Sequence, residues 1–220
     1  MTDDLSADVT AGLSIVSEYW NDRAQRYSSD CEKVEWSLRS QRMRFETFLL
    51  FHDLNDKSVL DVGCGTGHFA GHLAQRNITA KYTGIDLSKE MILRCKELYP
   101  AANFILGNIL DGQETGAYDF TVSFGIHNIK VPGGREILER MTRRQFELCT
   151  TAAHVSILTD RFSGFAPHIQ PWRPEEILTL ALNITPFVVL RHDYLPNDFS
   201  ITLYRKPLID SRTDLLLDGE

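Results

Sequence analysis

Three kinds of segment are absent from this chain, and each absence narrows what the protein can be. No run of about 20 consecutive apolar residues occurs, so the sequence predicts no membrane-spanning helix and no membrane partner. No run of basic residues occurs and the formal net charge is -7, so a nucleic acid is not expected as a partner. The first residues are acidic and lack the basic and then apolar pattern of a secretory signal, so we expect a cytoplasmic protein.

Cysteine is also scarce, with 4 residues in a chain of 220. Cys31, Cys64, Cys95 and Cys149 form no C-x-x-C pair, and no histidine-rich segment accompanies them. This spacing is typical of reduced thiols rather than of a disulfide framework or a zinc site. The sequence therefore predicts no metal site.

Glycines are concentrated in one short segment, which is the most informative part of the chain. Residues 59–69 read Val-Leu-Asp-Val-Gly-Cys-Gly-Thr-Gly-His-Phe and predict a buried strand, a glycine-rich turn and a helix. Gly63, Gly65 and Gly67 remove every Cβ where a ligand would touch the backbone. The dinucleotide pattern G-x-G-x-x-G fits only in part, because the position of its third glycine is occupied by His68.

A second predicted strand, at 82–86, ends in the carboxylate of Asp86. An acidic residue about 20 positions past a glycine loop is where a ribose diol is held by two hydrogen bonds. A carboxylate only accepts hydrogen bonds, so this position also disfavours a phosphorylated ribose. The alternative, an ordinary capping or loop aspartate, is disfavoured by the spacing from the glycine loop.

Four segments, 59–69, 84–91, 103–111 and 118–128, together resemble the class I S-adenosylmethionine-dependent methyltransferases. The specific similarity covers roughly residues 40 to 160. The resemblance implies that S-adenosyl-L-methionine is the cofactor, that Asp61 and the glycine loop hold its amino acid end, and that Asp86 binds its ribose. Many family members carry Asp where this chain has Asn108, whose amide retains a contact with adenine. The further residues placed around the cofactor are Gly63, Cys64, Gly65, Gly67, Leu87, Met91, Ile109 and Phe124.

The alternation of apolar segments predicts an α/β fold: a doubly wound, seven-stranded, mostly parallel sheet with an antiparallel last strand, helices on both faces and N-terminal lid helices. Residues 195–198 form too short a connection for a parallel return. We expect an N-terminal helical lid segment (1–55), a Rossmann-like S-adenosylmethionine-binding domain (56–206) and a polar tail (207–220), within a single domain overall. Strands are expected near 57–62, 80–86, 102–107, 117–124, 152–159, 186–193 and 198–206, and helices near 10–27, 38–53, 67–76, 88–98, 134–149 and 174–184.

The loop after the fourth strand is expected to face the reacting centre, because open α/β sheets bind ligands at the carboxyl ends of their strands. Its polar residues are His127 and Asn128. His127 either receives a proton or is a hydrogen-bonded wall residue, and Asn128 holds an amine or a carboxylate in position. The loop lacks the Asn or Asp, paired prolines and aromatic residue typical of base methyltransferases, which disfavours that class.

Residues 18–27 are rich in aromatic and charged side chains, and in the resembling family such a segment often closes over the cofactor as a lid. Tyr19, Trp20, Arg23 and Tyr27 are candidate contacts of cofactor or substrate. Arg44 is a candidate partner for a carboxylate in a forked geometry. The alternative for these residues is helix packing with solvated arginines.

The last third of the chain contains a second group of candidates. Trp172 supplies an apolar wall beside a sulfonium, or is a core or cap aromatic. His192 is a second candidate to receive a proton, with Asp193 orienting it. Ser200 opens the last strand and is a candidate for holding the amino acid end of a ligand.

Three functions fit these residues. The first is in-line methyl transfer to a small-molecule or amino acid-like acceptor, in specialised metabolism, by a monomer or homodimer. The second is an S-adenosylmethionine cyclase or lyase on the same fold, which forms azetidine-2-carboxylate and methylthioadenosine and uses Asn128, Trp172 and Ser200. The third is a non-catalytic subunit that binds the cofactor. Methyl transfer is favoured by family frequency.

Overall fold

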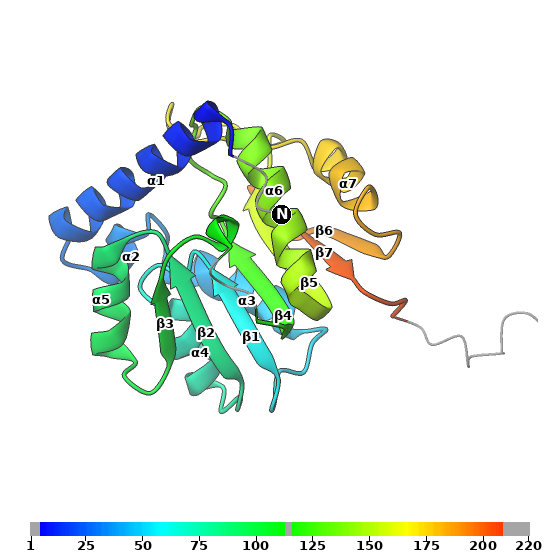
Figure 1. Ribbon diagram of the computed structural model, residues 1–220, viewed down its shortest axis with the longest axis horizontal. Helices are drawn as coiled ribbons and strands as arrows, with labels where there is room; N and C mark the ends of the chain where they lie inside the picture. Colours follow the sequence, from blue (N-terminus) through cyan, green and yellow to red (C-terminus); the bar gives the residue numbers. More distant parts are fainter. Residues whose placement is uncertain (1–4, 113–115, 209–220) are drawn as a thin grey trace, which may run out of the picture.

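The computed structural model describes residues 5–112 and 116–208, which contain one seven-stranded sheet (Figure 1). The strands are β1 (Ser58–Val62), β2 (Lys81–Asp86), β3 (Asn103–Leu106), β4 (Tyr118–Phe124), β5 (Cys149–Leu158), β6 (Val188–Leu195) and β7 (Asp198–Tyr204). Their spatial order is β3-β2-β1-β4-β5-β7-β6. β1 to β5 pair in parallel, and β7 runs antiparallel to both β5 and β6. The predicted fold class is confirmed.

The helices agree with the sequence pattern except for two short ones. They are α1 (Ala7–Arg26), α2 (Asp30–Lys33), α3 (Leu38–Leu49), α4 (His68–Gln75), α5 (Lys89–Leu98), the 3-10 turn η1 (Ile109–Asp111), α6 (Gly134–Leu148) and α7 (Pro174–Leu182). α1 begins earlier than expected because the Ser6 side chain caps it by accepting a hydrogen bond from the Val9 N–H. α2 and η1 are too short to give an apolar periodicity.

Two helical layers cover the sheet. On one face, α3 and α4 contribute Phe48 and Phe69 to a core that includes Val59 of β1 and Phe120 of β4. On the other face, α6 and α7 pack over the part of the sheet formed by β5 and β7. The helices cover both faces of the central strands, so a ligand can reach these strands only at their ends.

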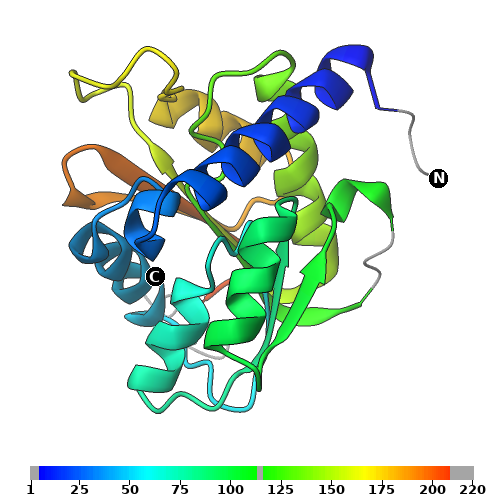
Figure 2. The ribbon, with the colours of Figure 1, turned by 90° about the vertical axis from the view of Figure 1, so that its left-hand side faces the viewer.

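Helix α1 crosses the edge at which the parallel strands end (Figures 1 and 2). The Ser17 hydroxyl donates to the Leu87 carbonyl at 3.3 Å, and the Ser88 hydroxyl donates to Asn21 Oδ1 at 2.7 Å. Nearer the start of α1, a Cβ on Gly12 would lie 2.3 Å from the Pro132 carbonyl oxygen, so a glycine is needed for this close approach. Contacts along its length therefore fix α1 above the strand ends.

Most of the predicted polar tail lies outside the described residues, since the description ends at residue 208. Within the described part of the chain, no helix is both long enough and apolar enough to cross a membrane.

Candidate functional site

A pocket, here called the main pocket, lies where β1, β2 and β4 end beneath α1. The α1 side chains Leu13, Val16 and Trp20 form its roof. The predicted cofactor-binding residues that line it are Arg44, Asp61, Gly63, Cys64, Gly65, Asp86, Leu87, Met91, Asn108, Ile109 and Phe124. Residues from distant parts of the chain thus meet at the edge where α/β sheets bind ligands.

The turn after β1 contains three glycines, which adopt positive φ angles and leave room for neighbouring groups. Gly63 has φ +69°, and a Cβ there would lie 2.2 Å from Ile126 Cγ2. Gly65 has φ +55° and lines the pocket. Gly67, at φ +79°, is the N-cap of α4 and packs against Tyr99, so it shapes the turn without lining the pocket. The first two glycines bring backbone to the pocket wall.

Asp61 is a buried carboxyl, with 2% of its surface exposed. The Tyr82 hydroxyl donates to Asp61 Oδ2 at 2.7 Å. Burial raises the pKa of Asp61 to about 7, with a further contribution from the charge of Asp86, while the Tyr82 hydrogen bond lowers it. A cationic ligand beside Asp61 would favour its charged form.

Asp86 is fixed between the glycine turn and the start of α5. Its Oδ2 accepts from the Gly65 N–H at 2.8 Å, and its Oδ1 accepts from the Ser88 N–H at 2.8 Å. Burial raises the pKa of Asp86 to about 6, against the opposing effect of these backbone hydrogen bonds. Each carboxylate oxygen has a second lone pair, so Asp86 can still accept from two hydroxyl groups.

Asn108 has a structural task as well as a place in the pocket. Its Oδ1 accepts from the Leu110 N–H at 3.0 Å, and its own N–H donates to Asp111 Oδ2 at 3.3 Å, which caps η1. The capping bond uses one lone pair of Oδ1, so the side chain can still offer its N–H donors and one further acceptor position to a ligand.

Arg44 is paired inside the protein. Its Nη2 lies 2.7 Å and its Nε 2.9 Å from Asp198 Oδ2, and Arg44 is 2% exposed. Its guanidinium lies 3.4 Å from the centroid of the Trp36 ring. The alternative of a solvated arginine is wrong for Arg44, because α3 docks this residue against the start of β7.

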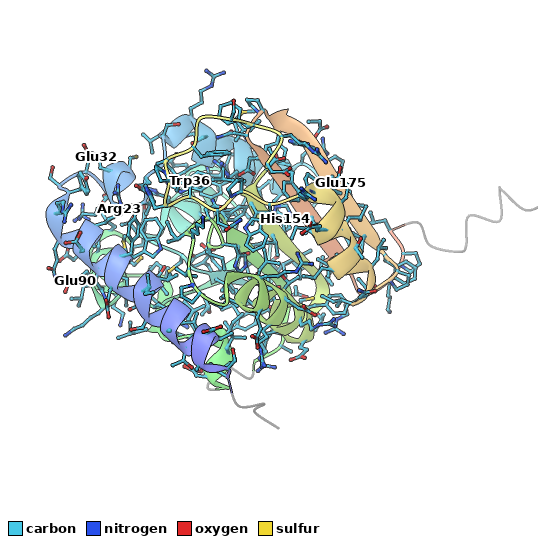
Figure 3. All side chains as sticks on the ribbon, turned by 90° about the horizontal axis from the view of Figure 1, so that it is seen from above. Arg23, Glu32, Trp36, Glu90, His154 and Glu175 are labelled. Carbon is cyan, nitrogen blue, oxygen red and sulfur yellow. The ribbon has the colours of Figure 1, made fainter. Side chains whose placement is uncertain are left out.

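A second hollow, here called the side pocket, adjoins the main pocket and shares Trp20, Trp36, Arg44 and Gly125 with it. Figure 3 looks down on this part of the molecule, with Arg23 labelled near the end of α1 and Trp36 further in. The remaining side chains come from the segment before α3, the first turn of α3, the loops after β4 and β5, and the turn between β6 and β7. They include Glu35, Ser37, Ser40, Asn128, Phe165, His168, Ile169 and Asn197.

Comparison with known proteins agrees with this geometry. Residues 59–145 match the family model described as a methyltransferase domain. Over these residues the chain is similar to methyltransferase domains, and its sheet has the class I, Rossmann-like fold.

Solved structures resemble almost the whole chain. The magnesium protoporphyrin IX methyltransferase of Synechocystis PCC 6803 with bound SAM has a TM-score of 0.65 and 17% identity, and the match covers 93% of this chain and 100% of that one. The DhpI–SAH complex has a TM-score of 0.66 and 16% identity, with coverages of 90% and 97%. At these identities the likeness shows the fold.

Curated relatives match shorter stretches. The putative methyltransferase 235L of Invertebrate iridescent virus 6 is 33% identical over 70 residues, which are 32% of this chain and 26% of the relative. The trans-aconitate 2-methyltransferase of Rhodopseudomonas palustris (strain BisA53) is 42% identical over 53 residues, 24% of this chain and 21% of the relative. The chain thus spans about a quarter or less of the length of these relatives.

Several predicted site residues lie away from both pockets. The His127 side chain is buried, its Nε2 has no hydrogen-bond partner, and burial lowers its pKa to about 3. Trp172 donates from Nε1 to the His127 carbonyl at 2.8 Å and belongs to the core under α7. His192 is exposed on β6, the edge strand, and Ser200 is buried on β7. The structure therefore does not bring these four side chains to the pockets.

The aromatic residues of α1 divide in a way the sequence pattern did not reveal. Trp20 lines both pockets, whereas Tyr19 and Tyr27 line neither. The Tyr19 hydroxyl lies 3.2 Å from His168 Nε2, and burial together with Glu35 raises the pKa of Tyr19 to about 12. Tyr27 lies under the Arg23 guanidinium, at 4.6 Å from the ring centroid. Tyr19 thus joins α1 to the loop after β5, whereas Tyr27, the C-cap of α1, packs against α1 itself.

Gln41 of α3 was not among the predicted site residues. It lines the main pocket, is 8% exposed, and its Oε1 is buried without a hydrogen-bond partner. It lies one helical turn before Arg44, on the same face of α3, which is the only signal of its position in the sequence. Within residues 5–112 and 116–208, no group of three or more His, Cys, Asp or Glu could hold a metal ion.

Proposed function

We propose that this protein is an S-adenosylmethionine-dependent methyltransferase that acts on a small-molecule acceptor. The observation that carries the proposal is the Asp86 carboxylate, fixed by the Gly65 and Ser88 amides beside a glycine turn in a domain that matches the methyltransferase family. That arrangement suits a ribose with two free hydroxyl groups.

The residues around the main pocket fit the cofactor on two independent observations. The buried, unpartnered Oε1 of Gln41 needs a donor, which the ammonium group of a methionine moiety has. A Cβ at Gly63 would collide with Ile126, so the turn leaves no side chain between its backbone and a ligand. We assign the amino acid end to Asp61, Gly65 and Gln41, the ribose to Asp86, and the adenine to Leu87, Met91, Asn108 and Ile109.

The cofactor supplies a sulfonium whose methyl group is open to in-line displacement, and transfer to an oxygen or nitrogen leaves S-adenosylhomocysteine and one proton. The chain's own residues bind and orient the reactants. Leu13, Val16 and Trp20 exclude water from above, Asp61 fixes the amino acid end of the cofactor, and Asp86 fixes its ribose.

The side pocket favours methyl transfer over the two other functions that the sequence leaves open. A cyclase that forms azetidine-2-carboxylate needs no space for an acceptor, whereas a lined hollow adjoins the main pocket here. Of the three residues that the cyclase would use, Trp172 and Ser200 line neither pocket, and Asn128 lines the side pocket rather than the main pocket. A non-catalytic subunit would have no use for an acceptor hollow.

We propose the cytoplasm as the location, because all four cysteines are free thiols, which persist in a reducing compartment. We further propose a role in specialised metabolism, a monomer or homodimer, and no nucleic-acid partner, in keeping with the net charge of -7.

The test is to incubate the purified protein with S-adenosylmethionine, first alone and then with an acceptor library, and to analyse the small molecules by mass spectrometry. We expect the cofactor to stay intact alone and S-adenosylhomocysteine to form with an acceptor. Methylthioadenosine formed from the cofactor alone would instead support the cyclase. Absence of cofactor binding by calorimetry would refute all three functions.

A further inference from the structure

Asn128 carries a hydrogen-bond donor that the protein leaves unused at the side pocket. Its Oδ1 accepts from the Leu158 N–H at 3.2 Å, and a backbone N–H cannot donate to an amide nitrogen, so the orientation of the side chain is fixed. Its Nδ2 is buried without a partner, and the residue is 4% exposed. Buried donors are normally paired, so this one points to a ligand atom that accepts.

The walls around this donor favour a flat, apolar molecule. Trp20, Trp36 and Phe165 contribute aromatic rings, and Ile129 and Ile169 contribute aliphatic surface. Gly125 makes the arrangement possible, because a Cβ there would lie 2.3 Å from Trp36 Cζ2 and 2.9 Å from Asn128 Nδ2. Planar rings gain most from packing against aromatic walls of this kind.

The charges around the side pocket disfavour an anionic ligand. Among the described residues that line it, the ionisable ones are Glu35, Arg44 and His168. Arg44 is held by Asp198 at 2.7 Å, and His168 Nε2 lies 3.6 Å from Glu35 Oε1. Glu35 is itself paired with Arg23 at 2.9 Å. A ligand carboxylate would therefore find no free positive partner in this lining.

We infer that the side pocket is the acceptor subsite and takes a flat, uncharged molecule whose carbonyl or ring nitrogen accepts a hydrogen bond from Asn128 Nδ2. This inference rests on the proposed function, because it gives the chemical class of the acceptor that the methyltransferase would use. It separates this chain from enzymes whose acceptors are carboxylates.

The test uses two fluorescent probes that differ in one charged group, 7-methoxycoumarin and 7-methoxycoumarin-3-carboxylate. Each is titrated into the full-length protein, with and without S-adenosylhomocysteine, whose own binding is measured separately by calorimetry. We expect saturable binding of the neutral probe and binding of the carboxylate that is at least about tenfold weaker, which is a difference of about 1.4 kcal/mol.

Asn128→Asp is the informative variant, because it keeps an oxygen that accepts from Leu158 and replaces the donor nitrogen by a second, acidic oxygen. We expect this variant to bind the neutral probe with an affinity lower by about tenfold or more, while its affinity for S-adenosylhomocysteine stays unchanged. Asn183→Asp is the matched control, since it makes the same change at an exposed residue that lines neither pocket. It should leave the affinity for the neutral probe within about twofold.

Each result decides a different claim. No binding of the neutral probe, tighter binding of the carboxylate, or full affinity in Asn128→Asp would overturn the assignment of the subsite. Failure of S-adenosylhomocysteine to bind the wild-type protein would overturn the proposed function instead. Probe binding can be measured without the nucleoside, so the two failures are distinguishable.

Discussion

Arg44 and Asp198 form an ion pair that joins α3 to the start of β7 across the interior of the domain. Arg44 Nη2 lies 2.7 Å from Asp198 Oδ2, and the two side chains are 2% and 0% exposed. Asp198 also accepts from the Ser156 hydroxyl at 2.9 Å and from the Tyr194 hydroxyl. The pair thereby fixes the side of α3 that faces both pockets.

Removing one partner of this pair is expected to be costly, because the other charge stays buried. Asp198→Asn should lower the free energy of unfolding by about 3–5 kcal/mol. The double variant Arg44→Met, Asp198→Leu should recover much of that loss, since an apolar pair of similar volume is often tolerated. Urea unfolding of the three proteins checks the prediction. A single variant as stable as the wild type would show that water reaches the pair.

The Asp86 carboxylate is expected to be essential for binding the cofactor but not for folding. Asp86→Ala should abolish detectable S-adenosylmethionine binding in calorimetry, because the ribose hydroxyls lose their acceptor. The circular dichroism spectrum should stay unchanged. Asp193→Ala is the control, as it removes an exposed carboxylate on β6 that pairs with Arg191 away from the pockets. Undiminished affinity in Asp86→Ala would refute the ribose assignment.

The contrast between Asp86 and His127 shows what the sequence could predict. Asp86 was predictable because a strand, its terminal residue and the preceding glycine turn are local features with a fixed spacing. His127 follows a strand in the same way, but its side chain turns into the core, where the Trp172 indole meets its carbonyl. That orientation depends on a loop from a distant segment, which no local pattern reports.

Gln41 shows the same limit on a helix. The apolar periodicity of 38–53 predicted a helix, and Gln41 and Arg44 share one face of it. Whether that face meets solvent, core or pocket depends on how α3 docks against the sheet. The local pattern therefore predicted the element but not the buried, unpartnered oxygen.

Gln41 itself is expected to affect binding and stability in opposite directions. Gln41→Leu should lower the affinity for S-adenosylmethionine by about tenfold, or about 1.4 kcal/mol. The same change should leave the unliganded protein equally or more stable, because it removes a buried acceptor without a partner. Gln41→Glu should retain affinity, since a carboxylate also accepts from an ammonium group. Equal affinity in all three proteins would remove Gln41 from the site.

The buried Asp61 carboxyl should make the unliganded protein less stable as the pH rises. Burial raises the pKa of Asp61 from its usual 3.8 to about 7, so between those values the folded state holds a proton that the unfolded state has lost. Stability then falls with rising pH across this window, by roughly 4 kcal/mol at most for a shift of about three units. Asp61→Asn, whose side-chain oxygen still accepts from Tyr82, should flatten this part of the profile. Parallel urea-unfolding profiles for the two proteins would contradict the prediction.

Gly125 and Gly164 both have a left-handed backbone, but only Gly125 is closely packed. Comparing their alanine variants therefore distinguishes the cost of backbone strain from the cost of filling space beside the acceptor subsite. Gly125 has φ +77° and would place a Cβ against Trp36 and Asn128, whereas Gly164 has φ +92° and no atom within 4 Å of such a Cβ. Both alanine variants should lose about 1–3 kcal/mol of stability through backbone strain. Gly125→Ala should lose more, because Trp36 and Asn128 must also move.

Ligand affinities of the two alanine variants then show which substitution also affects the acceptor subsite. Gly125→Ala should strongly lower the affinity for 7-methoxycoumarin, since both walls of its subsite are displaced. The affinity for S-adenosylhomocysteine should fall less. Gly164→Ala should bind both ligands as the wild type does, because nothing lies near the added methyl group. If the two variants bound the coumarin equally well, the contact of Trp36 and Asn128 across Gly125 would have no part in holding an acceptor.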